Sequence, residues 1–214
     1  MEQHEPTIPP FRADGYLPDG VYSASEAEVT FRFGASSRRR RRLALRLRRW
    51  IQLGRQVGGK RLLVDGSFVT AKANPNDLDA VIFLPQDFEQ LVEDGVEAAL
   101  ELEEMLLTRR PEEIFAAEDE DDWNGWVEFF GRTREADGRR KGLVDCTMIA
   151  NDTEYQKAQE EIRALEGRLE RLQVANPIGS KGFTKAGIRK MIARLHEELA
   201  IYEGSVEARQ TDSN

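Results

Sequence analysis

The sequence has one cysteine, two histidines and no long apolar run, and each shortage excludes a class of protein. Because Cys146 is the single cysteine, an intrachain disulfide framework and a metal site built from several cysteines are excluded. With only His4 and His196 available, catalysis or metal binding centred on histidine is not expected. The longest apolar run, residues 80–84, is far too short to span a membrane, and the first residues hold no apolar core of signal-peptide length. We therefore expect a cytoplasmic protein with no membrane contact.

Charged residues, in contrast, are plentiful and mostly acidic. They make up 33% of the 214 residues, 40% are hydrophobic, and the net charge is -8. This balance is typical of a globular chain and argues against a general nucleic-acid coat. Eight arginines between Arg38 and Arg49 nevertheless form a basic run. The run is interpreted as a solvated helix face, as the lining of a cleft that contacts nucleotide or RNA phosphates, or as a separate binding patch. Five successive arginines cannot all share one helix face.

Proline, glycine and apolar spacing divide the chain into four parts. Residues 1–35 carry several prolines and are predicted to be an irregular arm. Residues 36–150 combine helix and strand patterns, which predicts an α+β domain with a mixed sheet packed on helices. Residues 151–204 show heptad spacing interrupted at 176–179, which predicts an α-helical hairpin of coiled-coil type. Residues 205–214 are polar and expected to be disordered.

Local patterns predict the elements of the α+β domain. Helices are expected at residues 36–57 and 87–107, strands at 60–66, 78–84, 126–130 and 142–149, a solvated loop at 118–122 and a turn at 134–140.

One stretch within this domain carries acids in a strand pattern. Residues 62–84 read LLVDGSFVTAKANPNDLDAVIFL. Since side chains alternate along a strand, Asp77 and Asp79 point to the same face, about 7 Å apart. Two such carboxylates repel each other unless a cation lies between them, and Mg²⁺ or Mn²⁺ is the natural occupant.

The glycine and serine that precede these acids suit a phosphate. A glycine at a strand end lets the backbone approach a phosphate closely, and the following turn exposes amide donors. Gly66 and Ser67 are therefore predicted to cradle phosphates. Lys72 and Lys141 are interpreted either as triphosphate contacts or as ordinary surface lysines.

The spacing of these residues resembles that of a known superfamily. Gly66-Ser67, nine residues, then Asp77-Leu78-Asp79-Ala80 is similar to the signature of nucleotidyltransferases with the DNA polymerase β fold. The resemblance covers about residues 36–150. The segments GSFVTAKANPNDLDAVIF and KGLVDCTMI also resemble small bacterial nucleotidyltransferase-like proteins associated with toxin–antitoxin systems.

The resemblance implies a polymerase β-like core and a third carboxylate from a later strand, for which Asp145 is the best match. Asp77, Asp79 and Asp145 would then be the catalytic metal ligands. The implied reaction transfers NMP from an NTP, with ATP expected, to a protein hydroxyl or an RNA 3′ end in a toxin–antitoxin or defence system. The alternative is a catalytically degenerate fold that acts as a partner-binding, antitoxin-like module.

Two features depart from the family pattern. The spacer is one residue shorter than in the minimal nucleotidyltransferases, and Asp65 stands where the family has an apolar residue. Asp65 either points away from the phosphates or helps to hold metal. The hairpin resembles the helical region of helix-turn-helix antitoxins, which implies docking to a toxin or antitoxin partner. It is alternatively a homodimer contact or a cover for the catalytic domain.

Overall fold

The structure, a computed structural model, describes residues 8–108, 114–133, 135, 138–149, 152–175 and 185–211. Its fold is α+β, with a mixed five-stranded sheet. The chain divides into two compact units, residues 5–148 on the one hand and residues 1–4 with 149–214 on the other.

The sheet belongs to the first unit and has its earliest strand beside its latest. The strands are β1 Gly20–Ser25, β2 Arg61–Asp65, β3 Asp79–Phe83, β4 Ile114–Ala117 and β5 Gly142–Thr147. Their spatial order is β1-β5-β2-β3-β4. The central strand β2 runs antiparallel to β5 and β3, whereas β1 pairs with β5 and β3 with β4 in parallel.

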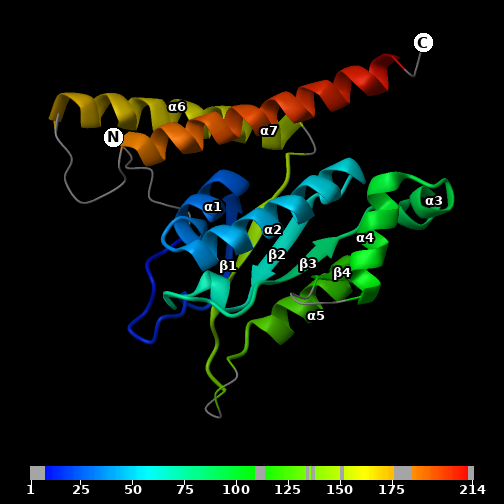
Figure 1. The fold of residues 1–214 in the computed structure, drawn as a ribbon, viewed down its shortest axis with the longest axis horizontal. Helices are drawn as coiled ribbons and strands as arrows, with labels where there is room; N and C mark the ends of the chain where they lie inside the picture. Colours follow the sequence, from blue (N-terminus) through cyan, green and yellow to red (C-terminus); the bar gives the residue numbers. More distant parts are fainter. Residues whose placement is uncertain are drawn as a thin grey trace. The chain divides into compact units, whose positions relative to one another are not determined.

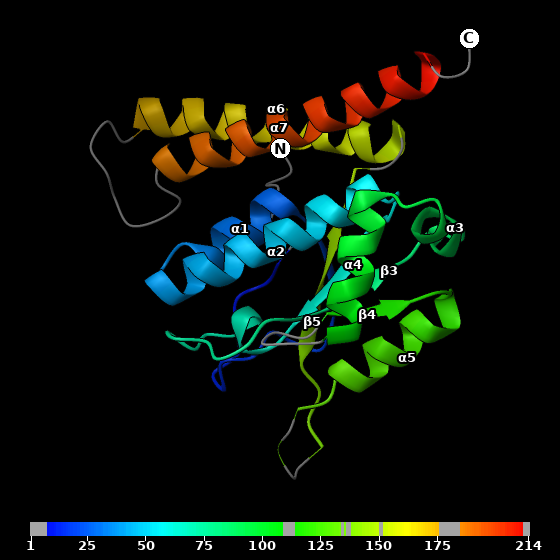
Figure 2. The same cartoon turned by 45° about the vertical axis from the view of Figure 1, so that its right-hand side comes forward.

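Helices cover both faces of this sheet, as Figures 1 and 2 show. They are α1 Glu26–Gly34, α2 Arg38–Gln56, α3 Phe88–Glu93, α4 Glu97–Thr108 and α5 Glu120–Phe130. Strand alternation sends Leu62 and Val64 into the core shared with α1, α2 and α4. The residue between them, Leu63, packs on the other face with Trp123 and Phe130 of α5.

The predicted strands 60–66, 78–84 and 142–149 are confirmed as β2, β3 and β5, and the helix at 36–57 is confirmed as α2. Ser37 is the N-cap of α2, since its hydroxyl accepts a hydrogen bond from the Arg40 N–H. The helix predicted at 87–107 is divided into α3 and α4. Gly95 lies between them with a φ of 74°, a conformation that glycine adopts without strain.

The irregular arm predicted for residues 1–35 is wrong for its second half, because residues 20–34 form β1 and α1. Ser25 ends the strand and caps the helix by accepting from the Glu28 N–H. The partner of β1 is β5, more than a hundred residues later, so no local pattern announces the pairing.

The loop predicted at 118–122 and the strand predicted at 126–130 are both wrong. These residues form α5, and the sequence analysis also missed β4. Asp119 caps α5 by accepting a hydrogen bond from the Asp122 N–H. Three acids fill the first turn, where their negative charges interact favourably with the positive end of the helix dipole. Trp126 and Phe130 stack at a spacing of four residues, which is a helical rather than a strand neighbour relation. Of the turn predicted at 134–140, the structure describes residues 135 and 138–140, and the Gly138 N–H donates to the Glu135 carbonyl oxygen over 3.3 Å, as in a β-turn.

The second unit contains the two predicted helices, α6 Asp152–Ala175 and α7 Lys185–Thr211. Tyr155 near the start of α6 contacts Tyr202 near the end of α7, at 5.5 Å between ring centroids, so the helices run antiparallel. The break predicted at 176–179 lies outside the described residues. The disorder predicted for 205–214 is wrong for residues 205–211, which continue α7. No helix in the described ranges is long and apolar enough to cross a membrane.

Candidate functional site

A cavity of about 840 Å³ opens at one end of the inner strands, where β2 ends and β3 and β5 begin. Its volume lies within the range of about 300–1,000 Å³ that is usual for small-molecule sites. Of the residues predicted from the sequence, it is lined by Gly66, Ser67, Lys72, Asp77, Asp79 and Lys141. The cavity therefore gathers every predicted site residue except Asp145.

Gly66 lies at the turn from β2 into the short 3₁₀ helix η1, Ser67–Val69. Its φ is 82°, and a Cβ at this position would lie 3.0 Å from the Asp77 oxygen and from the Asp79 nitrogen. Any side chain would thus press the β2 turn away from the start of β3. Glycine is required here to bring the two strand ends together.

Ser67 and Asp77 are joined by a dense set of hydrogen bonds. The Ser67 N–H donates to Asp77 Oδ1 over 2.7 Å, and the Ser67 hydroxyl donates to the same oxygen. The hydroxyl oxygen in turn accepts from the Asn76 N–H over 2.7 Å and from the Asp77 N–H over 3.2 Å. The two donors that the sequence predicts for a phosphate are therefore used by the Asp77 carboxylate.

Asp65 points into the cavity, which answers the question that the sequence left open. It lies directly opposite Asp79 in the β2–β3 register, and the two residues are only 4% and 8% exposed. Lys141 Nζ lies 2.6 Å and 2.7 Å from the two carboxylate oxygens of Asp65. Burial raises the pKa of Asp65 above its usual value, and the charge of Lys141 opposes that rise.

Asp145 lies apart from this group. It is opposite Leu63 in the β2–β5 register, so it shares the sheet face of Asp79 but is two residues deeper, with β2 in between. Its Oδ2 accepts from Arg61 Nε over 3.0 Å, and a second guanidinium nitrogen of Arg61 lies 2.9 Å away. The Arg61 guanidinium also lies 4.1 Å from the centre of the Trp123 ring. The structure thus brings Asp65, rather than Asp145, to the two acids of the predicted pair.

The donor set of the cavity suits a hard divalent cation. Asp65, Asp77 and Asp79 supply carboxylate oxygens, the ligands that Mg²⁺ and Mn²⁺ prefer. Like charges directly opposite each other on neighbouring strands are destabilising. A cation at these strand ends would therefore relieve the repulsion between Asp65 and Asp79. Within the described ranges, no three histidine, cysteine or acidic side chains are already arranged around a metal position. A cation would compete with Lys141 for Asp65 and with Ser67 for Asp77.

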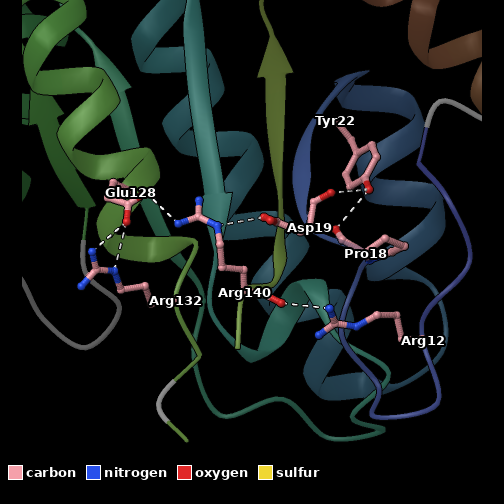
Figure 3. A network of polar contacts seen from close by, with 7 residues as sticks. All are labelled: Arg12, Pro18, Asp19, Tyr22, Glu128, Arg132 and Arg140. Carbon is pink, nitrogen blue, oxygen red and sulfur yellow. Dashed lines mark hydrogen bonds and ion pairs between the residues drawn. The ribbon is translucent and has the colours of Figure 1, made fainter. Parts of the chain in front are cut away.

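A network of ion pairs holds the segment that leads into β5, and Figure 3 shows it from close by. Arg140 Nη1 donates to Glu128 of α5 over 2.7 Å, and its Nε donates to Asp19 over 3.2 Å. Arg132 donates to the other oxygen of Glu128. These donated hydrogen bonds hold the pKa of Glu128 below its usual value. Glu128 does not line the cavity.

The same network fixes the position of the backbone at Lys141. Arg12 donates to the Arg140 carbonyl oxygen over 2.9 Å, as Figure 3 shows, and the Lys141 N–H donates to the Gly131 carbonyl oxygen over 2.8 Å. Both bonds hold backbone atoms next to the Lys141 side chain, whose ammonium is hydrogen-bonded to Asp65.

Two walls of the cavity carry residues that the sequence analysis missed. The arm contributes residues 13–16, and the end of α5 contributes Phe129 and Phe130. Tyr16 donates to Glu135 over 3.1 Å, and burial together with Glu135 raises the pKa of Tyr16. Phe129 is 66% exposed although it is a large apolar side chain. The aromatic spacing at 126–130 is the sequence signal for the α5 wall, but it predicts a strand where the structure has a helix.

The eight arginines of α2, all of them described, do not line this cavity. Arg49 pairs with Glu101 of α4, and Arg48 lies 3.4 Å from Glu26 of α1. Arg41 and Arg42 are exposed, in keeping with a solvated face for part of the run. Arg39 and Arg40 instead reach backbone oxygens of the loop that follows Ser67.

Comparison with known proteins bears on the first unit. The model of a protein family of unknown function, DUF6932, matches residues 9–147, which include all five strands of the sheet and every residue that lines the cavity. No curated protein and no solved structure matches the chain.

Proposed function

We propose that this chain, which belongs to the DUF6932 family of unknown function, is a nucleotidyltransferase that depends on Mg²⁺ or Mn²⁺ and has a polymerase β-like core. One observation carries the proposal. The Gly66-Ser67 turn and three buried or half-buried aspartates meet in a cavity large enough for a small molecule. A turn that exposes amide donors beside hard oxygen ligands is suited to a nucleoside triphosphate with its cation.

Each residue of the cavity has a role in this proposal. Asp77 and Asp79 would hold the cation, which when bound would stabilise the attacking and leaving oxygens of an in-line displacement. The N–H and hydroxyl of Ser67 would bind the triphosphate, Gly66 would let the backbone approach it closely, and Lys72 and Lys141 would neutralise its charge. The acceptor oxygen bonds to the α-phosphorus, pyrophosphate leaves, and the hydroxyl proton passes to a carboxylate of the cavity.

The third carboxylate has two candidates. The resemblance assigns it to Asp145, and that assignment stays a prediction. Asp65 is the alternative that we favour, because it lines the cavity and lies opposite Asp79. The two candidates differ in their present partners, which are Arg61 for Asp145 and Lys141 for Asp65.

For the acceptor we favour a protein hydroxyl over an RNA 3′ end. The cavity lining contains five acids and three bases, and the whole chain carries a net charge of -8. Both properties oppose the approach of a polyphosphate strand. A toxin or antitoxin protein that docks on the helical hairpin would be such an acceptor.

A partner-binding module without catalysis is the second candidate function. Two contacts favour it: Lys141 occupies both oxygens of Asp65, and Asp77 occupies the donors of Ser67. If these contacts persist, neither cation nor phosphate enters, and the cavity has no catalytic role.

Calorimetric titration of the full chain with ATP separates the two functions. Nucleotidyl transfer requires that ATP binds with Mg²⁺ and does not bind with EDTA, because the acids repel phosphate until a cation neutralises them. Incorporation of radiolabelled nucleotide into a candidate partner protein or RNA then identifies the acceptor. Equal ATP affinity in Mg²⁺ and in EDTA would contradict the proposal, and absence of binding in both would favour the non-catalytic module.

A further inference from the structure

Arg40 is a buried arginine whose guanidinium is spent on backbone oxygens. It is 4% exposed and lies in the first turn of α2. One terminal nitrogen donates to the carbonyl oxygens of Phe33 over 2.9 Å and of Phe68 over 2.7 Å. The other donates to those of Thr70 over 2.6 Å and of Lys72 over 2.5 Å. One side chain thus ties the end of α1 to three alternate residues of the loop after Gly66.

Arg39, its neighbour in sequence, reaches the other half of the same loop. Its Nε donates to the Pro75 carbonyl oxygen over 3.1 Å, and a terminal nitrogen donates to that of Asn76. The two arginines together hold the spacer between Ser67 and Asp77, which is the segment that sets how the glycine–serine turn faces the acid pair.

The backbone that the arginines hold is bonded in turn to Ser67. The Thr70 hydroxyl donates to the Ser67 carbonyl oxygen over 2.8 Å, and the Asn76 N–H donates to the Ser67 hydroxyl oxygen over 2.7 Å. Arg40 binds the carbonyl oxygen of Thr70, and Arg39 binds that of Asn76. Each arginine is therefore linked to Ser67 through one intervening residue that is itself hydrogen-bonded to Ser67. Both flanks of the serine are therefore anchored to the same turn of α2.

We propose that Arg40, assisted by Arg39, is a positioning residue that places Ser67 and Lys72 for triphosphate binding. The inference rests on the proposed function and deepens it. Neither arginine lines the cavity, so both act through the loop rather than on a ligand. A guanidinium offers five N–H donors in a planar fork, whereas a lysine ammonium is a point charge on a flexible stem. Lysine therefore cannot hold the four carbonyl oxygens in one geometry.

The test is Arg40→Lys in the full chain, with two matched controls on α2. Arg42→Lys makes the same exchange at an exposed position, and Ile51→Val lowers stability from a fully buried position that does not contact the loop by any hydrogen bond. Hydrogen exchange of the amides at 67–77 and the Kd for ATP with Mg²⁺ are measured for each variant. We expect faster exchange of these amides and a Kd weaker by about 10- to 100-fold only in Arg40→Lys, the range seen when orienting groups are removed.

Unchanged exchange and affinity in Arg40→Lys would overturn the inference. So would an equal loss of affinity in Ile51→Val at a comparable drop in Tm, since the effect would then be general destabilisation. If the wild-type chain binds no ATP with Mg²⁺, the proposed function fails, and the exchange data alone test whether Arg40 holds the loop. Faster exchange confined to residues 67–77 in Arg40→Lys supports that role, and exchange as in the wild type overturns it.

Discussion

Asp77 accepts hydrogen bonds from the two Ser67 donors that a phosphate would use. Replacing Asp77 by alanine should therefore have two opposite effects. Binding of ATP with Mg²⁺ should be lost, because a cation ligand is removed. Binding of inorganic triphosphate in EDTA should appear, because the Ser67 N–H and hydroxyl are released. Calorimetric titration of both ligands measures these effects.

Asp77→Asn is the matched control for this prediction. It removes the charge but keeps an amide oxygen that can accept from Ser67, so the donors stay occupied. A gain of triphosphate binding in Asp77→Asn as large as in Asp77→Ala would show that charge, and not occupation of the donors, excludes phosphate.

Lys141 compensates a carboxylate that burial disfavours, so its loss should be costly. In Lys141→Met we expect the free energy of unfolding to fall by about 3 kcal/mol at neutral pH, the scale of a broken buried ion pair. The pKa of Asp65, already raised by burial, rises further without Lys141. Since the neutral carboxyl tolerates burial, the deficit should shrink as pH falls below the new pKa and grow as pH rises through it.

Urea titrations near neutral pH and in mild acid measure this deficit. The exposed Lys72 provides the control, because Lys72→Met should cost little at either pH. A deficit in Lys141→Met that does not change with pH would mean that the loss comes from packing rather than from the charge of Asp65.

At this scale the sequence was informative where chemistry is local. Gly66, Ser67, Asp77 and Asp79 were recognisable because a glycine at a strand end and two acids at alternate positions are short-range patterns, and the structure brings all four into one cavity. The inward direction of Asp65 depends on Lys141, which arrives from β5, and no local pattern contains that contact.

Among the elements, the register of β5 decides which acid joins the pair. Asp145 lies three residues after Gly142, the first residue of β5, and therefore about 10 Å along the strand from the end where the cavity opens. Asp65 is the last residue of β2 and lies at that end of the strands. We therefore expect Asp65→Asn to abolish binding of ATP with Mg²⁺, and Asp145→Asn to retain it while losing stability through Arg61.

Nucleotide titrations and thermal melts of the two variants measure this difference. If Asp145→Asn loses nucleotide binding at wild-type Tm while Asp65→Asn keeps it, the role belongs to Asp145, as the resemblance implies.

The same elements explain which parts of the fold were predictable. Strands buried on both faces, such as β2, appear as apolar runs, and α2 has a capping serine and a helical apolar spacing. The helix α5 was missed because its aromatic residues have high strand propensity, while Asp119 is recognisable as a cap only once the helix is known. The edge strand β1, GVYSAS, shows no clear alternation of apolar and polar residues, and its partner β5 lies more than a hundred residues later in the chain.

For the whole molecule, every cavity-lining residue lies between residues 13 and 141, within the first compact unit. We expect a chain ending at residue 150 to keep its affinity for ATP with Mg²⁺. The same truncation should change the oligomeric state or abolish partner binding, because the amphipathic helices α6 and α7 are removed. Light scattering and nucleotide titration of both chains test this. A folded truncated chain that does not bind nucleotide would assign the hairpin to the active site.

The insertion of β5 between β1 and β2 has a consequence for biosynthesis. As the chain leaves the ribosome, β1, β2, β3 and β4 all emerge before β5, yet β1 has no strand partner until β5 arrives. Until residue 147 has emerged, β1 and β2 each present an open edge that can pair with another nascent chain. Formation of the sheet, and with it delivery of Lys141 to Asp65, therefore waits for the last strand to be translated, and premature termination before β5 should yield an aggregation-prone product rather than a smaller domain.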